Sequence, residues 1–127
     1  MSLFSWSVFS SPSTLKLSRL VNNLIETVPI KRDYLERIQL GLHEALVNAV
    51  IHGNEGRSSK NIRIRRIVTP NWLVWQIQDQ GKGIPLKKRT SLLPSELEAE
   101  SGRGLFFIHQ CFDDVRWSNK GNRIQVA

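Results

Sequence analysis

Three polar side chains recur at intervals of four residues within an otherwise apolar segment. They are Glu44, Asn48 and His52 in GLHEALVNAVIHGNEG (residues 41–56). Residues four apart share one face of an α-helix, so a carboxylate, an amide and an imidazole would form one stripe. A solvated stripe is typically built from good helix formers such as Lys, Glu and Gln, whereas Asn and His are poor ones. The stripe is therefore either an ordinary solvated face or a face that chemistry requires.

A second group of candidates lies at the end of a predicted strand. The segment NWLVWQIQD alternates from Leu73 to Ile77, and a period of two places Asp79 on the same core-facing side. An unpaired carboxylate in that position would be expensive to bury. Gly81 and Gly83 follow in DQGKGIP. Glycine lets a backbone turn sharply or approach a ligand closely, although a plain exit from a strand uses the same residues.

The third candidate is a glycine-flanked helix start in SGRGLFFIHQCF (residues 101–112). Ser101 to Gly104 are predicted to precede a helix that turns Leu105, Ile108 and Phe112 inward. Such a helix start offers free N–H groups and the positive end of the helix dipole to a phosphate. An ordinary glycine-rich helix start would look the same. The polar stretch that follows Pro85 predicts a long loop or lid before it.

Other elements must position these groups. An apolar alternation through Trp6 and Val8 predicts a short first strand. Ser13 or Thr14 is predicted to cap a first helix that ends before Pro29, and a second helix should run from about Asp33 to His52. Further strands are predicted in NIRIRRIV and NWLVWQIQD, joined by a turn at Pro70–Asn71, and in DDVRWSN and NRIQVA.

The bulk composition limits the classes of protein. With 127 residues and 40% hydrophobic content, the chain is expected to form a single domain, residues 1–127, with a real core. Neither a signal peptide nor a membrane span is predicted, and a single cysteine suits a reducing compartment, so we expect a cytoplasmic protein. The net charge of +7 comes from scattered basic residues outside any nucleic-acid-binding motif. Nucleic-acid binding is therefore disfavoured, and an acidic protein partner explains the charge equally well.

Taken in order, the three candidate groups resemble a known ATP-binding fold, the one shared by gyrase, the Hsp90 chaperones, histidine kinases and the MutL proteins. Within that group, HEALVNAVIHGNEG, DQGKGIP and SGRGLFFIHQCFDDV are most similar to the anti-sigma-factor serine kinases. The resemblance covers roughly residues 14–127. It implies an α+β fold of two layers, in which a mixed, mostly antiparallel sheet is covered on one face by helices and ATP binds between them.

The resemblance also implies roles for individual residues. Glu44 matches the general base for an acceptor serine hydroxyl, Asn48 the ligand of Mg²⁺, and Asp79 the acceptor for the adenine amino group. The remaining nucleotide-binding residues that it implies are Gly81 and Gly83 beside the adenine, and Gly102, Arg103, Gly104 and Leu105 at the phosphates.

The implied activity is ATP-dependent phosphorylation of an anti-anti-sigma (STAS-type) partner, together with regulation of a sigma factor and homodimerisation. Two departures from the family pattern leave an alternative open. Ala99 and Glu100 stand where relatives often carry a basic residue, and Asn122 stands where many have Thr. The chain could therefore be an ATP-binding regulatory module without phosphotransfer, and a nucleic-acid-associated protein is the third hypothesis.

Overall fold

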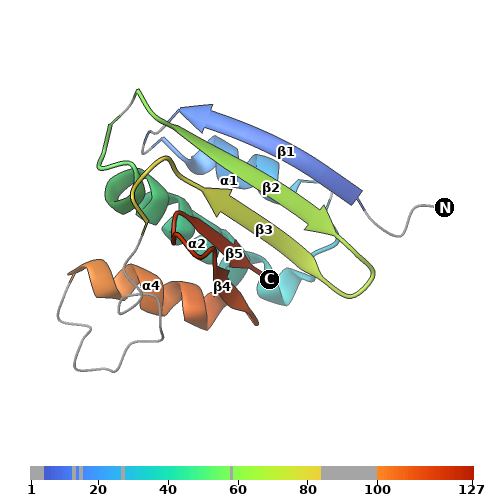
Figure 1. Cartoon of the computed structure of the whole chain (residues 1–127). Coiled ribbons are helices and arrows are strands. Elements are labelled where there is room, and N and C mark those ends of the chain that lie inside the picture. Colours follow the sequence, from blue (N-terminus) through green and yellow to red (C-terminus); the bar gives the residue numbers. More distant parts are fainter. Residues whose placement is uncertain (1–4, 13, 15, 27, 58, 84–99) are drawn as a thin grey trace.

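The architecture is a five-stranded sheet with helices on one of its faces (Figure 1). The computed structural model describes residues 5–12, 14, 16–26, 28–57, 59–83 and 100–127, without the side chains of residues 5, 6 and 100–104. The elements follow in the order β1 (Ser5–Pro12), α1 (Ser18–Ile25), α2 (Arg32–Asn48), η1 (Ala49–Gly53), β2 (Asn61–Val68), β3 (Leu73–Gln78), α4 (Glu100–Cys111), β4 (Val115–Trp117) and β5 (Arg123–Val126).

The sheet has the strand order β1-β2-β3-β5-β4, and every pairing between these strands is antiparallel. The predicted α+β fold of two layers is confirmed, and no parallel pair occurs among the described strands, although the resemblance implies a mixed sheet. The predicted strands in NIRIRRIV and NWLVWQIQD are present as β2 and β3, joined by a turn in which Thr69 and Trp72 exchange hydrogen bonds.

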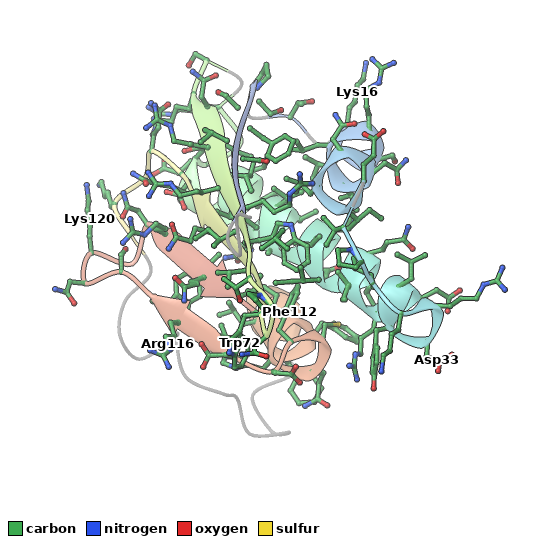
Figure 2. The ribbon with its side chains drawn as sticks, turned by 90° about the vertical axis from the view of Figure 1, so that its right-hand side faces the viewer. Lys16, Asp33, Trp72, Phe112, Arg116 and Lys120 are labelled. Atoms are coloured by element: carbon green, nitrogen blue, oxygen red, sulfur yellow. The ribbon has the colours of Figure 1, made fainter. Side chains whose placement is uncertain are left out.

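Alternation along the strands separates a core face from an open face. Ile62, Ile64, Trp75 and Ile77 are buried beneath the helices, whereas Arg63 between them is exposed. Figure 2 shows the sheet close to edge-on, with Phe112 between the layers and Arg116 on the side away from the helices. The first strand is also confirmed and extends to Pro12, but its Val8 lies on the open face and is 63% exposed.

Helix α2 packs against both other helices beneath the sheet. Its Gly41 lies so close to α4 that an added Cβ would come within 2.7 Å of Cys111 and 2.6 Å of Phe112. Helix α1 is tied to the sheet by Trp75, whose indole N–H donates to the Leu24 carbonyl at 3.1 Å. The two helices that flank the candidate site are therefore held in close contact with each other.

The first helix begins later than the sequence predicts. Helix α1 starts at Ser18 with Leu17 as its N-cap, and no side chain caps it, so the prediction for Thr14 is wrong. Ser13, the other predicted cap, lies outside the described residues. Leu17 is fully buried, and this burial of an apolar residue at the cap position outweighs the preference for a polar cap.

The C-terminal end of α1 is bound by a side chain from the sheet. One guanidinium nitrogen of Arg66 on β2 donates to the carbonyls of Asn23, Leu24 and Glu26 at 3.1–3.3 Å. The same guanidinium lies 5.2 Å from the Phe9 ring centroid. A cation is favourable at this end of a helix, where carbonyl groups lack partners within the helix.

Replacing Arg66 by Ala is expected to lower the free energy of unfolding by about 1.5–3 kcal/mol, because carbonyls at the end of α1 lose a charged donor. Urea denaturation measures this change. Arg63→Ala is the matched control, since Arg63 lies on the same strand but is exposed on the open face, and it should cost less than about 0.5 kcal/mol. Equal losses in the two variants would contradict this role of Arg66.

Candidate active site

Helix α2 presents Glu44 and Asn48 one turn apart, as the spacing predicts. Asn48 is 9% exposed, and Glu44 is half-buried. Burial raises the pKa of the Cys111 thiol on α4; the Arg37 charge opposes this shift and the Glu44 carboxylate adds to it. The carboxylate of Glu44 therefore lies within electrostatic range of Cys111 on α4.

The predicted stripe breaks after Asn48. Residues Ala49–Gly53 form a π-helical turn, η1, in which the Asn54 N–H donates to the Ala49 carbonyl at 2.8 Å. His52 falls within this wider turn and is exposed, so it does not continue the stripe of Glu44 and Asn48. π-turns are rare and occur frequently at functional sites.

The wide turn brings the end of η1 against the end of β3. Asp79 is 9% exposed, and a Cβ added to Gly53 would overlap its carboxyl group. The Asp79 backbone N–H donates to the carbonyl of Asn122 at 2.9 Å, and its Oδ1 accepts from the Gly81 N–H at 2.7 Å. Three segments that are distant in sequence therefore meet at Asp79.

The charge of Asp79 is incompletely compensated. Burial raises the pKa of its carboxyl group above the ordinary value of 3.8. The Gly81 hydrogen bond and the charges of Lys60 and Lys120 oppose this effect without cancelling it. One carboxylate oxygen is engaged by Gly81, and no hydrogen bond to the other is found in the described part of the chain. The group can thus act as an acceptor for a donor that comes from outside the protein.

Glycine is required at positions 81 and 83 because another backbone segment lies very close to each of them. A Cβ at Gly81 would overlap the Gly53 carbonyl, and a Cβ at Gly83 would overlap the Lys120 carbonyl. Gly83 also has a φ of +94°, a conformation that other residues rarely adopt. Both glycines therefore allow close approach to other backbone segments of the chain, and their predicted approach to a ligand stays a prediction.

Replacing Gly81 by Ala is expected to cost about 1–3 kcal/mol of stability, because the new methyl group must displace the Gly53 backbone. Thermal unfolding measures the loss. The control is Gly56→Ala: Gly56 has a φ of +70° with open space around it, so its cost is limited to the backbone strain of roughly 1 kcal/mol. A smaller loss at Gly81 than at Gly56 would contradict the overlap.

Asn54 is a site-forming residue that the sequence interpretation missed. Its side chain is fully buried; its Oδ1 accepts from the Gln80 N–H at 2.7 Å, and its Nδ2 donates to the Asn61 carbonyl at 3.2 Å. One amide thus connects the end of η1 with the strands β2 and β3. The available signal was an Asn between Gly53 and Gly56, directly after the predicted second helix, where the same residues are also typical of an ordinary helix end.

The glycine-rich start of α4 lies inside the helix rather than before it. Helix α4 begins at Glu100, so Gly102, Arg103 and Gly104 have helical backbone, and the prediction that Ser101 to Gly104 precede the helix is wrong. Glycine costs only about 1 kcal/mol in a helix, which burial of Leu105 and Ile108 outweighs. The Leu105 side chain belongs to the core. The predicted loop after Pro85 lies outside the described residues.

Basic side chains surround the Asp79 end of the site. A cavity of about 490 Å³ is lined by Arg57, Lys60, Lys82 and Lys120 together with Glu55, Gln80 and Gly81. Because four cations face one acid there, the electrostatic potential favours an anionic ligand nearby.

Within the described residues, no group of three or more His, Cys, Asp or Glu side chains could hold a metal ion. Asn48 is a single polar group that is more than nine-tenths buried, and no described residue hydrogen-bonds its amide. This donor set fits Mg²⁺ that arrives with a nucleotide, since Mg²⁺ is commonly held by one or two protein oxygens, substrate phosphates and water. It does not fit a metal ion held by protein groups alone.

The antiparallel sheet covered on one face by helices agrees with the fold of a known class of ATPase domains. Residues 10–127 match the family described as the histidine kinase-like ATPase domain, and the chain belongs to that family. ATP is the nucleotide that this family implies. None of the helices described is long and apolar enough to cross a membrane.

Individual relatives support a narrower class. An anti-sigma F factor of Bacillus licheniformis is 33% identical over 86 residues, covering 65% of this chain and 59% of that protein. A second, from Anoxybacillus flavithermus, is 33% identical over 93 residues, covering 71% and 64%. The serine-protein kinase RsbW of Listeria monocytogenes is 23% identical over 115 residues, covering 84% and 73%. The resemblance to anti-sigma-factor kinases is confirmed, and the chain spans less than two thirds of the length of the anti-sigma F factors.

Proposed function

We propose that the protein is an ATP-dependent protein serine/threonine kinase of the anti-sigma-factor type. The observation that carries this proposal is the joint construction of the site. One helix bears Glu44 and Asn48, and the π-turn that ends it places Gly53 against the Asp79 carboxylate. In this proposal the general base, the ligand of Mg²⁺ and the acceptor for the adenine amino group are all held by one continuous segment and the strand that it contacts.

In this proposal the adenine of ATP lies at Asp79. The carboxylate oxygen that Gly81 leaves available accepts a hydrogen bond from the adenine amino group. Gly81 and Gly83 shape the wall beside the base, and their lack of side chains allows the close packing of that wall. The incomplete compensation of the Asp79 charge supports this role, because a bound donor would stabilise the charged form.

The phosphates lie toward the start of α4 and the Asn48 end of α2. The first residues of α4, among them Gly102, Arg103, Gly104 and Leu105, are proposed to lie against them, since a helix N-terminus carries a positive partial charge. The Asn48 side-chain oxygen would hold Mg²⁺. The metal, when bound, neutralises charge on the phosphate oxygens.

Glu44 is the proposed general base. Its carboxylate takes the proton of an acceptor serine hydroxyl while the hydroxyl oxygen forms a bond to the γ-phosphorus and the bond to the β-phosphate oxygen breaks. The products are a phosphoserine, ADP and a protonated Glu44 that returns its proton to solvent. The position of Glu44 one turn before Asn48 supports this role, because phosphoryl transfer depends chiefly on positioning and charge stabilisation.

The proposed partners follow from the relatives. The substrate would be a STAS-type anti-anti-sigma protein, and a sigma factor would be the regulated partner, with homodimerisation and a cytoplasmic location as further parts of the proposal. The alternative is an ATP-binding regulatory module without phosphotransfer. Ala99 and Glu100 favour it, because they stand where relatives often carry a basic residue.

Two measurements test the proposal. Calorimetric titration with ATP and ADP, each with and without Mg²⁺, should show magnesium-dependent binding by the wild-type protein. Incubation with γ-labelled ATP and the anti-anti-sigma proteins of the same genome should then label one of them. Binding without transfer to any of them would favour the regulatory module, and the absence of nucleotide binding would exclude both functions.

A further inference from the structure

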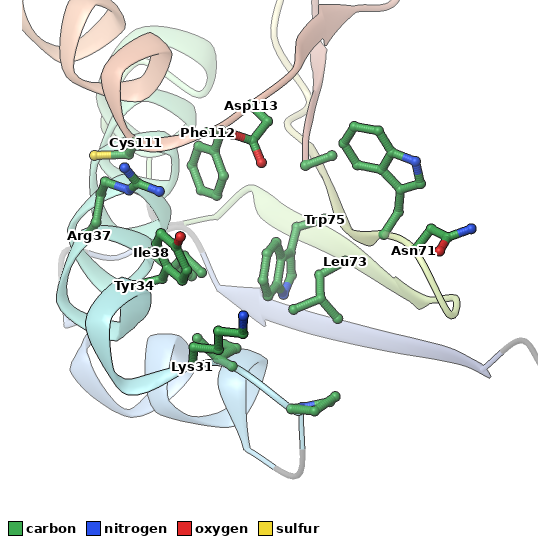
Figure 3. A pocket seen from close by; sticks show the side chains of 14 residues that line it. Lys31, Tyr34, Arg37, Ile38, Asn71, Leu73, Trp75, Cys111, Phe112 and Asp113 are labelled. Carbon is green, nitrogen blue, oxygen red and sulfur yellow. The ribbon is translucent and has the colours of Figure 1, made fainter.

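A second cavity lies away from the nucleotide site. It measures about 510 Å³, within the usual range for small-molecule sites, and is formed by the segment before α2, the first half of α2, the start of β3 and the end of α4 (Figure 3). The lining residue on α2 that lies nearest to Asn48 is Ile38, ten residues earlier, or about 15 Å along the helix. The nucleotide proposal assigns no role to this cavity.

The apolar part of the cavity is aromatic. Trp75 and Phe112 are buried with their ring centroids 6.2 Å apart, tilted by 56°. Tyr34 and Trp72 also line the cavity, and they are 45% and 49% exposed, which is unusual for rings of this size. A planar ring bound against these side chains would bury apolar area and gain ring–ring contacts.

The polar part of the lining favours an anion. Lys31 and Arg37 line the cavity, and the acidic residue there is Asp113, so cationic side chains outnumber anionic ones. Arg37 lies 5.0 Å from the centroid of the Tyr34 ring, which orients its guanidinium. Figure 3 shows Lys31 extending from the start of α2 toward the side of the cavity that holds Trp75 and Leu73.

We propose that this cavity binds a small organic carboxylate that carries an aromatic ring. The ring lies against Trp75, Phe112 and Trp72, and the carboxylate binds Arg37 and Lys31 at the mouth. The planar guanidinium of Arg37 can donate two parallel hydrogen bonds to a ligand carboxylate. A ligand with a neutral amide in place of the carboxylate cannot form this charged pair. The inference is independent of the proposed kinase activity, because none of these residues belongs to the nucleotide site.

The test is an NMR titration of the full chain with indole-3-acetate, compared with neutral indole-3-acetamide and cationic tryptamine. Indole-3-acetate should shift the resonances of Tyr34 and Trp72 with a dissociation constant at or below about 1 mM. The amide and the amine should bind more weakly than the acid. No shift of these resonances, or equal affinity for the three compounds, would overturn the proposal.

Two pairs of variants locate the binding. Arg37→Gln should weaken binding of the acid roughly 5- to 10-fold and leave the amide unchanged, whereas Arg32→Gln, an exposed residue on the first turn of α2, should change neither. Trp72→Ala should weaken the binding of both compounds. Phe107→Ala should not, because Phe107 is similarly exposed but lies outside the cavity. Because Trp72 is half exposed, its loss leaves the buried Trp75 in place. Equal effects within either pair would contradict the site.

Discussion

Replacing Glu44 by Gln is expected to lower phosphoryl transfer by a factor of about 10²–10⁴, because the amide cannot take a proton from the acceptor serine. Gln has almost the same size and shape, so the half-buried position on α2 remains filled. The affinity for Mg–ATP should stay unchanged, since Glu44 is assigned to the proton and not to the nucleotide. Single-turnover transfer of labelled phosphate and calorimetry measure the two quantities separately.

The matched control for this variant is Glu36→Gln. Glu36 is an exposed carboxylate on the same helix, so its replacement makes the same chemical change without touching the site. Transfer should proceed at the wild-type rate in this variant. If the Glu44→Gln protein retained transfer within the range of the control, another group would have to be the base.

The second large effect is expected for Asp79→Asn. The variant should lose ATP affinity by roughly 10- to 150-fold, which corresponds to the loss of a hydrogen bond to a charged group. The Asn side-chain oxygen can still accept from the Gly81 N–H, as Oδ1 of Asp79 does at 2.7 Å, so the loop should keep its conformation. The control is Asp113→Asn, which removes a charge at an exposed position away from this site. It should leave ATP binding unaltered.

The same variant should be at least as stable as the wild type at pH 7 without nucleotide. Burial raises the pKa of Asp79, so the folded state holds the proton more tightly than the unfolded state does. The charged carboxyl group therefore destabilises the folded state fully at pH values above its raised pKa. This destabilisation disappears as the pH falls below the pKa of the unfolded state, near 3.8.

Thermal unfolding across that pH range should show the two proteins converging in acid. A wild type that is clearly more stable than the variant at pH 7 would show that its Asp79 charge is stabilised within the chain. In that case the carboxylate would not be held ready for an external donor. Loss of ATP affinity with unchanged or higher stability is the combination that separates a binding role from a structural one.

Short-range periodicity was sufficient to predict much of this fold. Alternation of apolar residues predicts β2 and β3 and places Asp79 on the core-facing side, and these features are confirmed because neighbouring side chains decide them. Helical spacing likewise places Glu44 and Asn48 together on α2. Their chemical roles remain predictions that the experiments above address.

The features that escaped prediction depend on contacts between distant segments. A uniform period of 3.6 residues extends the stripe to His52, but the helix widens there into a π-turn. Gly53 packs against Asp79, and Asn54 hydrogen-bonds the start of β2 and the residues after β3. Nothing local distinguishes Asn54 from an ordinary helix terminator. The same holds for Gly41, whose missing side chain matters only because Cys111 and Phe112 pack against it.

The open face of the sheet limits how two copies of this protein could assemble. Register places Arg63, Gln78 and Arg123 side by side across β2, β3 and β5, and Arg65 lies two residues further along β2. Stacking two such faces would bring guanidinium groups against guanidinium groups in a poorly hydrated contact, which opposes association. Any homodimer should therefore form through an edge strand or a helix, and its affinity should change little as added salt screens the arginines.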